Sequence, residues 1–572
     1  MTTSASECDR TETLRSVGED VNAPTLSAAQ EVADMMRYVF FLILFLVVTV
    51  NVGSHATGDL PFKVTEMLNT QLRDKEFKAH DTQVYKCFQM ITTIDELHEF
   101  LTGPFYEVVY GSDSFDADST FPNGSTLPQR GTLGGASRIV GQVRIGQVRV
   151  RGQSCLGRMA YLSSLYDEVP TCYFDFSISR ESKDPFGYEF NYTAFATRPA
   201  EPTFYSLSYN SFPAPMFAVM LPSEENVHCE AESGDYEHCE VYKSLESLRT
   251  NKFFDKATRG IFIDFALYDM HIDHVTTVRL FLEHFQGGGL SPQAEFLTYR
   301  IYCYSTTADW IQFGLSISLL FVVVYQLYCE VKAQVNKWKY FKNISNLVQL
   351  SNYFAFFAVL LFRILSSWSL PWSLSQDNFI NFRSAITYYG LALNCHSFCC
   401  MLSWLKLFKF LSFIPMFGQL TRTVQQSAGK VIELLVIFFM CLLGASLAFT
   451  LGFGNLVYDY HSITASFFTL LHIVTGDIPL DELRQANRAI GPIFFMIYMF
   501  LMMFNIFIVI VSEAYSETKK EMRLLDMKME VLSMEIVNHI LHNVIFAIPF
   551  LGRYVFKPLY HRSQYATAKI AE

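Results

Sequence analysis

The sequence lacks the short motifs that mark common enzyme classes. It has no glycine-rich nucleotide-binding loop, no His-Glu-x-x-His zinc motif and no Gly-x-Ser-x-Gly nucleophile turn. A dense basic stripe is also missing, and the formal net charge is -11, which argues against a nucleic-acid partner. We therefore expect no enzyme, no catalytic residues, no bound cofactor and no resident metal.

Charge is also absent from long stretches of the chain. The chain has 572 residues, of which 51% are apolar and 15% aromatic. A signal peptide is not expected, because a basic start is missing and the first apolar run begins too late. Six runs have no charged side chain and are long enough to cross a hydrocarbon core of about 30 Å. They cover residues 38–58, 310–329, 344–362, 384–405, 434–458 and 489–512.

Basic residues in the short connections between these runs set the expected orientation. They gather between the second and third runs, between the fourth and fifth runs, and after the last run. All three groups are cytoplasmic if both chain ends are cytoplasmic, and segment 59–309 then lies outside the cell or in a lumen. The groups are Lys332, Lys337, Lys339 and Lys342; Lys406, Lys409, Arg422 and Lys430; and Lys519, Lys520, Arg523 and Lys528.

Cysteines and glycosylation signals support this placement of segment 59–309. An even number of cysteines in an oxidising compartment suggests disulfides. Cys229 and Cys239 are close in the chain and form one candidate pair, and the sequons at Asn123 and Asn191 are candidate glycosylation sites. The cysteines of the segment are Cys87, Cys155, Cys172, Cys229, Cys239 and Cys303.

Local patterns predict several elements of this segment. Residues 91–110 follow the spacing of an amphipathic helix, and the Gly/Ser/Asp-rich residues 111–136 favour a loop. The acidic residues of that loop do not follow the spacing of an EF-hand, so a calcium site is not expected there. Residues 261–268 and 275–283 alternate at strand period on either side of a polar turn and predict a β-hairpin.

The most informative stretch lies between the fifth and sixth runs. The apolar residues 462–474 are too few to span a bilayer, which takes about 20 residues, and they end at Thr475-Gly476-Asp477. Helix, re-entrant half-helix, Gly-acid turn and helix is the order of elements in a tetrameric cation-channel pore. In a four-fold assembly Asp477 forms a ring of carboxylates that favours cations, and we expect outer acidification to reduce the current.

Motifs around this stretch resemble the channel-forming members of the polycystin family of TRP channels. TGDIPLDELRQANRAIGPIFF covers residues 475–495, Asn505 and Phe507 lie in the last run, and SEAYSETK follows it. In segment 59–309, RIGQVRVRGQSC and RGIFIDFALYDMHIDHVTTVRLFLE also resemble the family. The resemblance implies a mainly α membrane protein with six transmembrane helices, a re-entrant pore loop, and a mixed α/β polycystin domain between the first two helices.

The resemblance also implies roles for single residues. It places the selectivity filter at Thr475, Gly476 and Asp477, the outer pore mouth at Asp481 and Glu482, the lower gate at Ile508 and Ser512, pore-helix support at Asn505, and a disulfide between Cys155 and Cys172. Lys406 and Lys409 at the end of the fourth helix either extend to the lipid headgroups or sense voltage.

Some positions depart from the family pattern. Thr475 stands where the family has leucine, and Arg484 and Gln485 stand where it has acids, so we expect a non-selective pore that passes Ca²⁺, Na⁺ and K⁺. Gln349 replaces a further acid, which argues against a cytosolic calcium site with Glu330. The fourth run carries His396 among Cys395, Cys399 and Cys400, a set for which packing is expected rather than metal binding.

The expected organisation follows from these assignments. A homotetramer in contact with membrane lipids is expected, with a larger polycystin-type receptor subunit as a further partner. The segments are a cytosolic arm (1–37), the first transmembrane helix (38–58), the polycystin domain (59–309), the second to fourth helices (310–410), a cytosolic linker (411–430), the pore domain (431–513) and a cytosolic tail without an EF-hand pattern (514–572).

Rival functions predict other features. A non-conducting receptor or partner subunit predicts a pore loop without Gly-Asp, and this chain has Gly476-Asp477. A secondary transporter predicts an internal repeat with broken helices in both halves, whereas one re-entrant segment and no repeat is found. Plasma membrane, ciliary membrane and internal stores all stay open, as does the gating stimulus.

Overall fold

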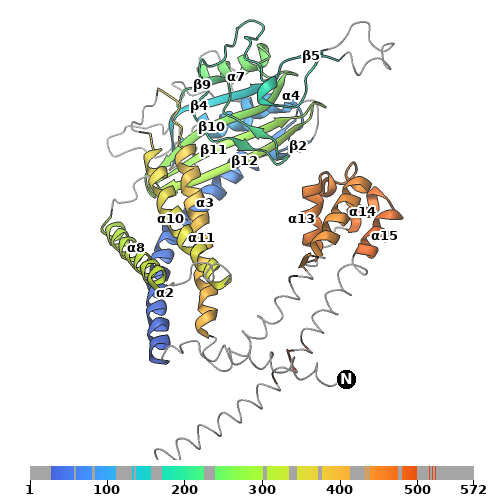
Figure 1. Cartoon of the computed structure of the whole chain (residues 1–572). Helices are drawn as coiled ribbons and strands as arrows, with labels where there is room; N and C mark the ends of the chain where they lie inside the picture. The colour runs from blue at the N-terminus through green and yellow to red at the C-terminus, as the bar shows by residue number, and fades with distance from the viewer. Residues whose placement is uncertain are drawn as a thin grey trace, which may run out of the picture. The chain divides into compact units, whose positions relative to one another are not determined.

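The structure is a computed structural model of the 572-residue chain (Figure 1). Two compact units make up the chain, Met1–Trp404 and Leu405–Glu572. The structure describes residues 28–56, 59–79, 84–110, 132–133, 137–155, 171–223, 239–300, 306–333, 344–371, 377–411, 432, 435–436, 438–474, 480–498, 515, 518–519 and 522.

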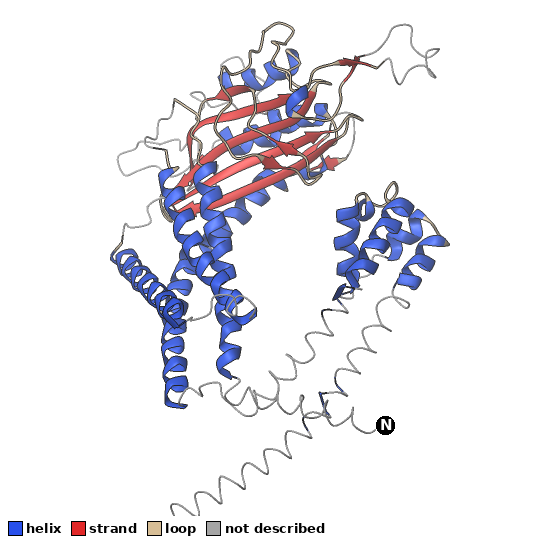
Figure 2. Ribbon diagram, viewed as in Figure 1, coloured by secondary structure: helices blue, strands red, loops and turns tan. Residues whose placement is uncertain are grey.

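A six-stranded antiparallel sheet forms the centre of the first unit (Figure 2). The strand order is β12-β11-β10-β4-β3, and β9 also pairs with β4. β10 and β11 form the predicted hairpin, in which Tyr268 lies opposite Val275. The strands are β3 (Thr132–Leu133), β4 (Ser137–Arg149), β9 (Phe217–Leu221), β10 (Thr258–Asp269), β11 (His274–His284) and β12 (Leu290–Arg300).

One face of this sheet forms the main hydrophobic core together with helices. Alternate residues of β10, such as Ile261 and Ile263, are fully buried there. The predicted helix over residues 91–110 is present, but Gly103 has non-helical backbone angles and divides it just before Pro104. The core helices are α4 (Ile94–Phe100), the π-helix η4 (Leu101–Phe105), α5 (Tyr106–Tyr110) and α7 (Glu240–Thr250).

Short strands and helices complete the part of the first unit that is built around this sheet, which we call the β-sheet domain. The loop prediction for residues 111–136 misses β3, and the rest of that loop, with Asn123, lies outside the described residues. Asn191 is exposed, as a glycosylation site requires. The short elements are β1 (Phe77–Lys78), β2 (Tyr85–Lys86), η3 (Phe88–Met90), β5 (Gln153–Ser154), β6 (Thr171–Cys172), η6 (Ile178–Arg180), β7 (Phe204–Tyr205) and β8 (Ser211–Phe212).

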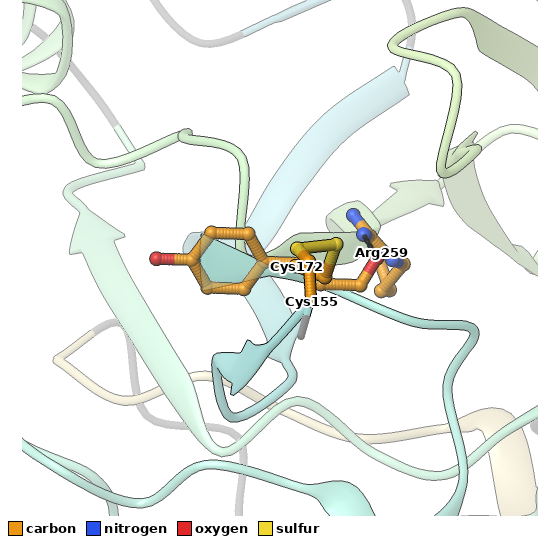
Figure 3. The surroundings of a disulfide bond; sticks show 4 residues. Cys155, Cys172 and Arg259 are labelled. Atoms are coloured by element: carbon orange, nitrogen blue, oxygen red, sulfur yellow. Dashed lines mark hydrogen bonds between the residues drawn. A yellow bond between two sulfur atoms is a disulfide. The ribbon is translucent and has the colours of Figure 1, made fainter. Parts of the chain in front are cut away.

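A disulfide joins Cys155 and Cys172 beside the short β5–β6 ladder, with a Cα–Cα distance of 5.4 Å (Figure 3). The guanidinium of Arg259 lies beside it and donates to the backbone carbonyl oxygens of Tyr173 at 2.6 Å and Phe174 at 2.9 Å. The segment after the disulfide is therefore fixed to β10. Cys239 is also disulfide-bonded, and Cys229, its candidate partner, lies outside the described residues.

A row of charged residues crosses the sheet on the face away from the main core. In the strand register Asp264 lies opposite both Arg144 and Arg279, and Arg279 lies opposite Glu295. Asp264 accepts from Arg144 and Arg279 at 2.5 Å each, and Glu201 accepts from Arg144 at 2.5 Å and from Arg279 at 3.1 Å. Burial works to raise the pKa of Asp264, but the charges of Arg279 and Arg144 outweigh it and lower that pKa. The carboxylate is therefore ionised although it is fully enclosed.

Long helices make up the rest of the first unit. Within the described residues, Thr307–Lys332 and Asn346–Trp368 are long and apolar enough to cross a membrane, and Met35–Val50 is a shorter apolar helix. The helices are α2 (Ala28–Ala56), α3 (Asp59–Leu68), the π-helix η2 (Asn69–Arg73), α8 (Thr307–Ala333), α10 (Ile344–Trp368) and α11 (Arg383–Leu411). Because α2 starts at Ala28, residues 28–37 of the predicted arm are helical.

Polar side chains connect these helices. The hydroxyl of Tyr38 in α2 donates to the Ser403 carbonyl of α11 at 2.6 Å, and the Gln312 amide of α8 donates to the Val48 carbonyl of α2 at 3.0 Å. Asn352 of α10 donates to the Ser403 hydroxyl at 3.1 Å. Such bonds between apolar helices fix their pairing in a membrane, where the hydrophobic effect discriminates little between helix faces.

Candidate functional site

The second unit holds the stretch that the sequence marks as the pore. It contains the apolar helix Phe438–Phe453, the turn η7 (Tyr458–Tyr460), α13 (Ile463–Val474), α14 (Leu480–Ala486) and α15 (Ile490–Ile497). α13 has twelve residues, which at about 1.5 Å per residue is too short to cross a bilayer. Its buried side chains include Leu470 and Ile473, which join Phe449, Phe453 and Tyr460 in one core.

Hydrogen bonds from neutral side chains hold α13 in place. The Ser466 hydroxyl of α13 and the Thr450 hydroxyl of the preceding helix are 2.7 Å apart. Thr469 donates to the Asp459 carbonyl at 3.1 Å, and Tyr498, just after α15, donates to the Leu470 carbonyl at 3.3 Å. The helix is thus attached to its neighbours on both sides of its sequence, so its direction is fixed.

The sequence Ala-Asn-Arg-Ala-Ile-Gly-Pro forms a tight turn between α14 and α15. The Asn487 side-chain oxygen accepts from the backbone nitrogens of Ala489 at 3.2 Å and Ile490 at 3.0 Å, which satisfies two donors at the start of α15. A Cβ atom on Gly491 would lie 2.4 Å from the Leu483 carbonyl oxygen, so only glycine permits this approach. The motif therefore positions α15 against α14.

The residues proposed as the filter lie between the end of α13 and the start of α14. α13 ends at Val474 and α14 begins at Leu480, and Thr475, Gly476 and Asp477 lie outside the described residues. The C-terminal end of a helix carries a partial negative charge, so α13 favours a cation at the position that follows it. The residues expected to form the filter thus come directly after a short, fixed helix in the sequence.

The acids of the outer turn are exposed. Asp481 and Glu482 form the first turn of α14, where carboxylates suit the helix dipole. Arg484 and Gln485 are exposed on the same helix, so the local charge is mixed rather than strongly acidic. This arrangement fits the weak negative charge expected at the pore mouth.

The other residues with a predicted role, in the gate or in voltage sensing, are described only in part. Asn505, Ile508 and Ser512 lie outside the described residues. Lys406 is half-buried near the end of α11, and the side chain of Lys409 lies outside the described part of the chain. The gate and the voltage-sensing assignments therefore stay predictions.

The departure at Gln349 has a structural counterpart. Its side-chain amide donates to Glu330 of α8 and is 2.7 Å from the Tyr353 hydroxyl. A neutral amide, rather than a second carboxylate, therefore lies beside Glu330. The ring of His396 is 3.1 Å from the Thr49 hydroxyl and packs on Phe45, so it takes part in the contact between α2 and α11.

Sequence reasoning missed the residues that hold α13. Thr450, Ser466, Thr469 and Tyr498 are isolated polar residues inside apolar runs, where the position of a partner depends on the packing of three helices. Their polarity in a charge-free stretch was the available signal, since a buried hydroxyl needs a partner. This signal identifies the four residues as contact residues, but it does not identify their partners.

Comparisons with known proteins point to one family. A sequence model of the polycystin cation channel matches residues 304–518, and one of the polycystin domain matches residues 87–302. The chain is 25% identical over 531 residues to polycystin-2 of Danio rerio, covering 90% of this chain and 55% of the relative. It is 23% identical over 502 residues to polycystin-2-like protein 1 of Homo sapiens, covering 86% and 58%, and 25% identical over 400 residues to polycystin-2 of Caenorhabditis elegans, covering 68% and 53%. The chain spans just over half the length of these relatives.

Proposed function

Because the chain belongs to the polycystin family, a family of membrane proteins, we propose that it is a subunit of a cation channel. The observation that carries the proposal is α13, an apolar helix of twelve residues that is attached by neutral hydrogen bonds and is followed directly by Thr475-Gly476-Asp477. An apolar helix of this length, with one side buried against its neighbours, has the form of a pore helix. Two of the relatives bear the name polycystin-2 and a third the name polycystin-2-like protein 1, and the matched family model is described as a cation channel.

The proposed assembly is a tetramer with six membrane helices in each subunit. Four copies of Asp477 would surround one axis and hold cations, with Gly476 supplying backbone freedom for the turn. Ile508 would close the inner end by excluding water, and Ser512 would lie beside it. The mixed charges of α14 support a non-selective pore for Ca²⁺, Na⁺ and K⁺ rather than a strongly calcium-selective one.

The orientation in the membrane is part of the proposal. With both chain ends cytoplasmic, the β-sheet domain lies outside the cell or in a lumen. The Cys155–Cys172 disulfide supports this side, because disulfides persist in oxidising compartments. The exposed Asn191 would then be open to glycosylation.

The test is single-channel recording of the purified chain in planar bilayers. We expect cation-selective unitary currents, and we expect Asp477→Ala to change conductance or selectivity and Asp477→Glu to preserve cation selectivity. Glu482→Gln is the matched control, because it removes an exposed acid at the outer turn and should have a smaller effect. Current that is unaffected by Asp477→Ala would overturn the filter assignment.

A non-conducting partner subunit is the second candidate. Part of the chain, 218 residues, is 27% identical to polycystin-1-like protein 3 of Homo sapiens. If wild-type protein is silent alone but changes the current of a co-reconstituted channel-forming polycystin, this second function replaces the first. The Gly476-Asp477 pair favours the channel, since a non-conducting subunit has no need for a cation-binding turn.

A further inference from the structure

A closed loop at residues 186–192 displays aromatic side chains on the surface of the β-sheet domain. The backbone nitrogen of Phe186 donates to the Tyr192 carbonyl at 3.2 Å, and that of Tyr192 donates to the Phe186 carbonyl at 2.7 Å. Between these two residues, Tyr188 is 79% exposed and Phe190 is 61% exposed. We call residues 186–192 the aromatic loop, because two large rings face solvent within a few positions of each other.

The aromatic loop is fixed both at its base and at its tip. At the base, the ring of Tyr192 is buried in the main core and lies 4.7 Å from the ring of Phe253, centre to centre. At the tip, the side-chain oxygen of Asn251 accepts from the backbone nitrogens of Glu189 at 2.9 Å and Phe190 at 3.0 Å. The exposed rings are therefore held on a backbone whose shape is set by the rest of the domain.

Glycine at position 187 permits this closed shape. Gly187 has a φ angle of +131°, which residues with a side chain rarely adopt. A Cβ atom at this position would collide with the Phe190 carbonyl oxygen. The sequence Phe-Gly-Tyr-Glu-Phe thus specifies a compact turn immediately before Asn191.

The aromatic loop runs into the sequon Asn191-Tyr192-Thr193. Asn191 and Thr193 are exposed, whereas Tyr192 between them is buried. The middle residue of the sequon is therefore an anchor, and the two residues that the glycosylating enzyme must reach lie on the surface. Because Tyr188 precedes Asn191 by three positions and Phe190 precedes it by one, a sugar on Asn191 starts in the loop that displays both rings.

We propose that the first sugar of a glycan on Asn191 packs against the rings of Tyr188 and Phe190, so that the glycan is a structural part of the β-sheet domain. The C–H groups on one side of a pyranose ring form an apolar, weakly positive face, which suits the negative face of an aromatic ring. The fixed loop lowers the cost of this packing, because the rings are ordered before the sugar is attached. The inference rests on the proposed orientation, since it requires this loop to be on the glycosylated side of the membrane.

The position of the sequon favours a glycan over a second protein as the cover of these rings. The glycan is joined covalently inside the loop, so its first sugar is always close to both rings. A bulky hydrophilic glycan on Asn191 would also hinder the approach of another protein surface to Tyr188. The exposed rings are thus accounted for by a partner that the same loop carries.

A double-mutant cycle on the full-length glycoprotein tests the packing. Thr193→Ala removes the glycan and leaves Asn191 in place, and Tyr188→Ala removes the more exposed ring. With the glycan present, we expect Tyr188→Ala to lower the melting temperature by about 2–4 °C, the shift for one aromatic contact in a domain of this size. Without the glycan, the same substitution should shift it by less than about 1 °C, because a ring this exposed loses little contact with protein.

Enzymatic trimming of the wild-type and Tyr188→Ala glycoproteins tests the role of the first sugar without any change at the sequon. An endoglycosidase that leaves one N-acetylglucosamine on Asn191 should preserve the effect of Tyr188→Ala on the melting temperature. Loss of the effect on trimming would overturn the proposal, because the contact would then belong to the outer sugars.

Tyr205→Ala is the matched control for the exposed ring. Tyr205 is 70% exposed, and its neighbour Phe204 packs on the face of the sheet away from the main core. The effect of Tyr205→Ala on the melting temperature should be the same with and without the glycan. A glycan-dependent effect of Tyr205→Ala as large as that of Tyr188→Ala would overturn the proposal, since the glycan would then stabilise the domain without a specific contact.

The remaining outcomes separate this proposal from the proposed function. A wild-type protein whose Asn191 carries no glycan, as shown by mass spectrometry, would contradict the proposed orientation and, with it, the packing. A glycosylated Asn191 with equal effects of Tyr188→Ala in both backgrounds would overturn the packing alone and would indicate that protein, such as a second copy of the chain, covers the ring. Coupling between ring and glycan in channels that conduct no current would support the packing and contradict only the proposed function.

Discussion

The two units of this chain hold their polar groups in different ways. In the β-sheet domain, arginines and carboxylates pair with one another deep in the structure, as Arg144, Asp264 and Arg279 show. In the second unit, neutral hydroxyl groups hold α13, among them those of Thr450 and Tyr498. Charged pairs thus hold the sheet, whereas neutral hydroxyl groups make the contacts described above for α13.

The proposed function accounts for this difference. A buried ion needs opposite charges close by, and the row in the sheet supplies them on both sides of Asp264. In a pore, a structural arginine near Asp477 would cancel the field that attracts cations. Neutral hydroxyl groups can fix α13 without altering that field, and they avoid the cost of a charge at membrane depth.

The strongest prediction breaks the charged row. Asp264→Asn leaves Arg144 and Arg279 buried with only Glu201 of the two carboxylates that they share, so we expect a loss of about 3–5 kcal/mol in the stability of the β-sheet domain. The measurement is thermal unfolding of the purified protein in detergent, together with the fraction that reaches the mature glycosylated form in cells.

The control for this variant is an exposed ion pair of the same chemistry. Arg73 and Asp74 are paired at 2.8 Å, but Asp74 is 44% exposed. Asp74→Asn should therefore cost less than about 1 kcal/mol. Equal losses of stability in Asp264→Asn and Asp74→Asn would mean that burial does not increase the contribution of the charged row to stability.

The second prediction concerns the pH dependence of stability in the β-sheet domain, where His98 is buried but is not part of the charged row of the sheet. His98 is 4% exposed and packs against Phe254, and its Nδ1 atom has no hydrogen-bond partner among the described residues. Burial lowers the pKa of His98 to about 4, the charge of Arg249 adds to this effect, and Asp95 opposes it. Because the folded pKa is below the unfolded one, the unfolded chain takes up the proton first, and stability falls as pH drops from about 6.5 toward 4.

Between pH 7 and pH 5, His98 should lower the free energy of unfolding of the β-sheet domain by about 2 kcal/mol. His98→Phe keeps an aromatic ring beside Phe254 and cannot titrate, so its melting temperature should fall less over this range than that of wild type. An identical pH dependence in both proteins would show that other groups, not His98, set the acid sensitivity.

Some of this architecture could be predicted from local patterns. The alternation in β10 and β11 predicts their hairpin because side-chain direction depends on neighbouring residues alone. The helix over residues 91–110 is likewise predicted by the spacing of neighbouring residues. It is interrupted at Gly103-Pro104, the residues most able to interrupt a helix. The assigned arm, residues 1–37, followed the charge-free run rather than the helix, and α2 extends beyond that run to Ala28.

Contacts between distant segments were beyond such patterns. Arg144 and Asp264 are 120 positions apart, and their pairing depends on the register of strands joined by long connections. Residues 378–383 lie in a connection between two apolar runs when the sequence is considered alone, and nothing local shows that their partners come from β4, β11 and β12. The order of elements around Thr475-Gly476-Asp477 indicated the candidate site, whereas the hydroxyl contacts of α13 needed the packed helices.

The smallest predicted effect concerns the neutral contacts of the pore helix. Tyr498→Phe removes the donor to the Leu470 carbonyl, a bond of 3.3 Å, and leaves the ring in place. We expect a loss of about 1 kcal/mol in stability, the usual value for one neutral hydrogen bond, and a measurable change in unitary conductance, because α13 leads directly to the filter residues.

Tyr458→Phe is the control for this last variant, since Tyr458 is 73% exposed and its hydroxyl should contribute little. The measurements are thermal unfolding and single-channel recording on the same preparations. A destabilised Tyr498→Phe channel with wild-type conductance would mean that the direction of α13 does not reach the filter. A loss as large as that of Asp264→Asn would remove the distinction between the two units, because neutral and ionic contacts would then be equally costly to break.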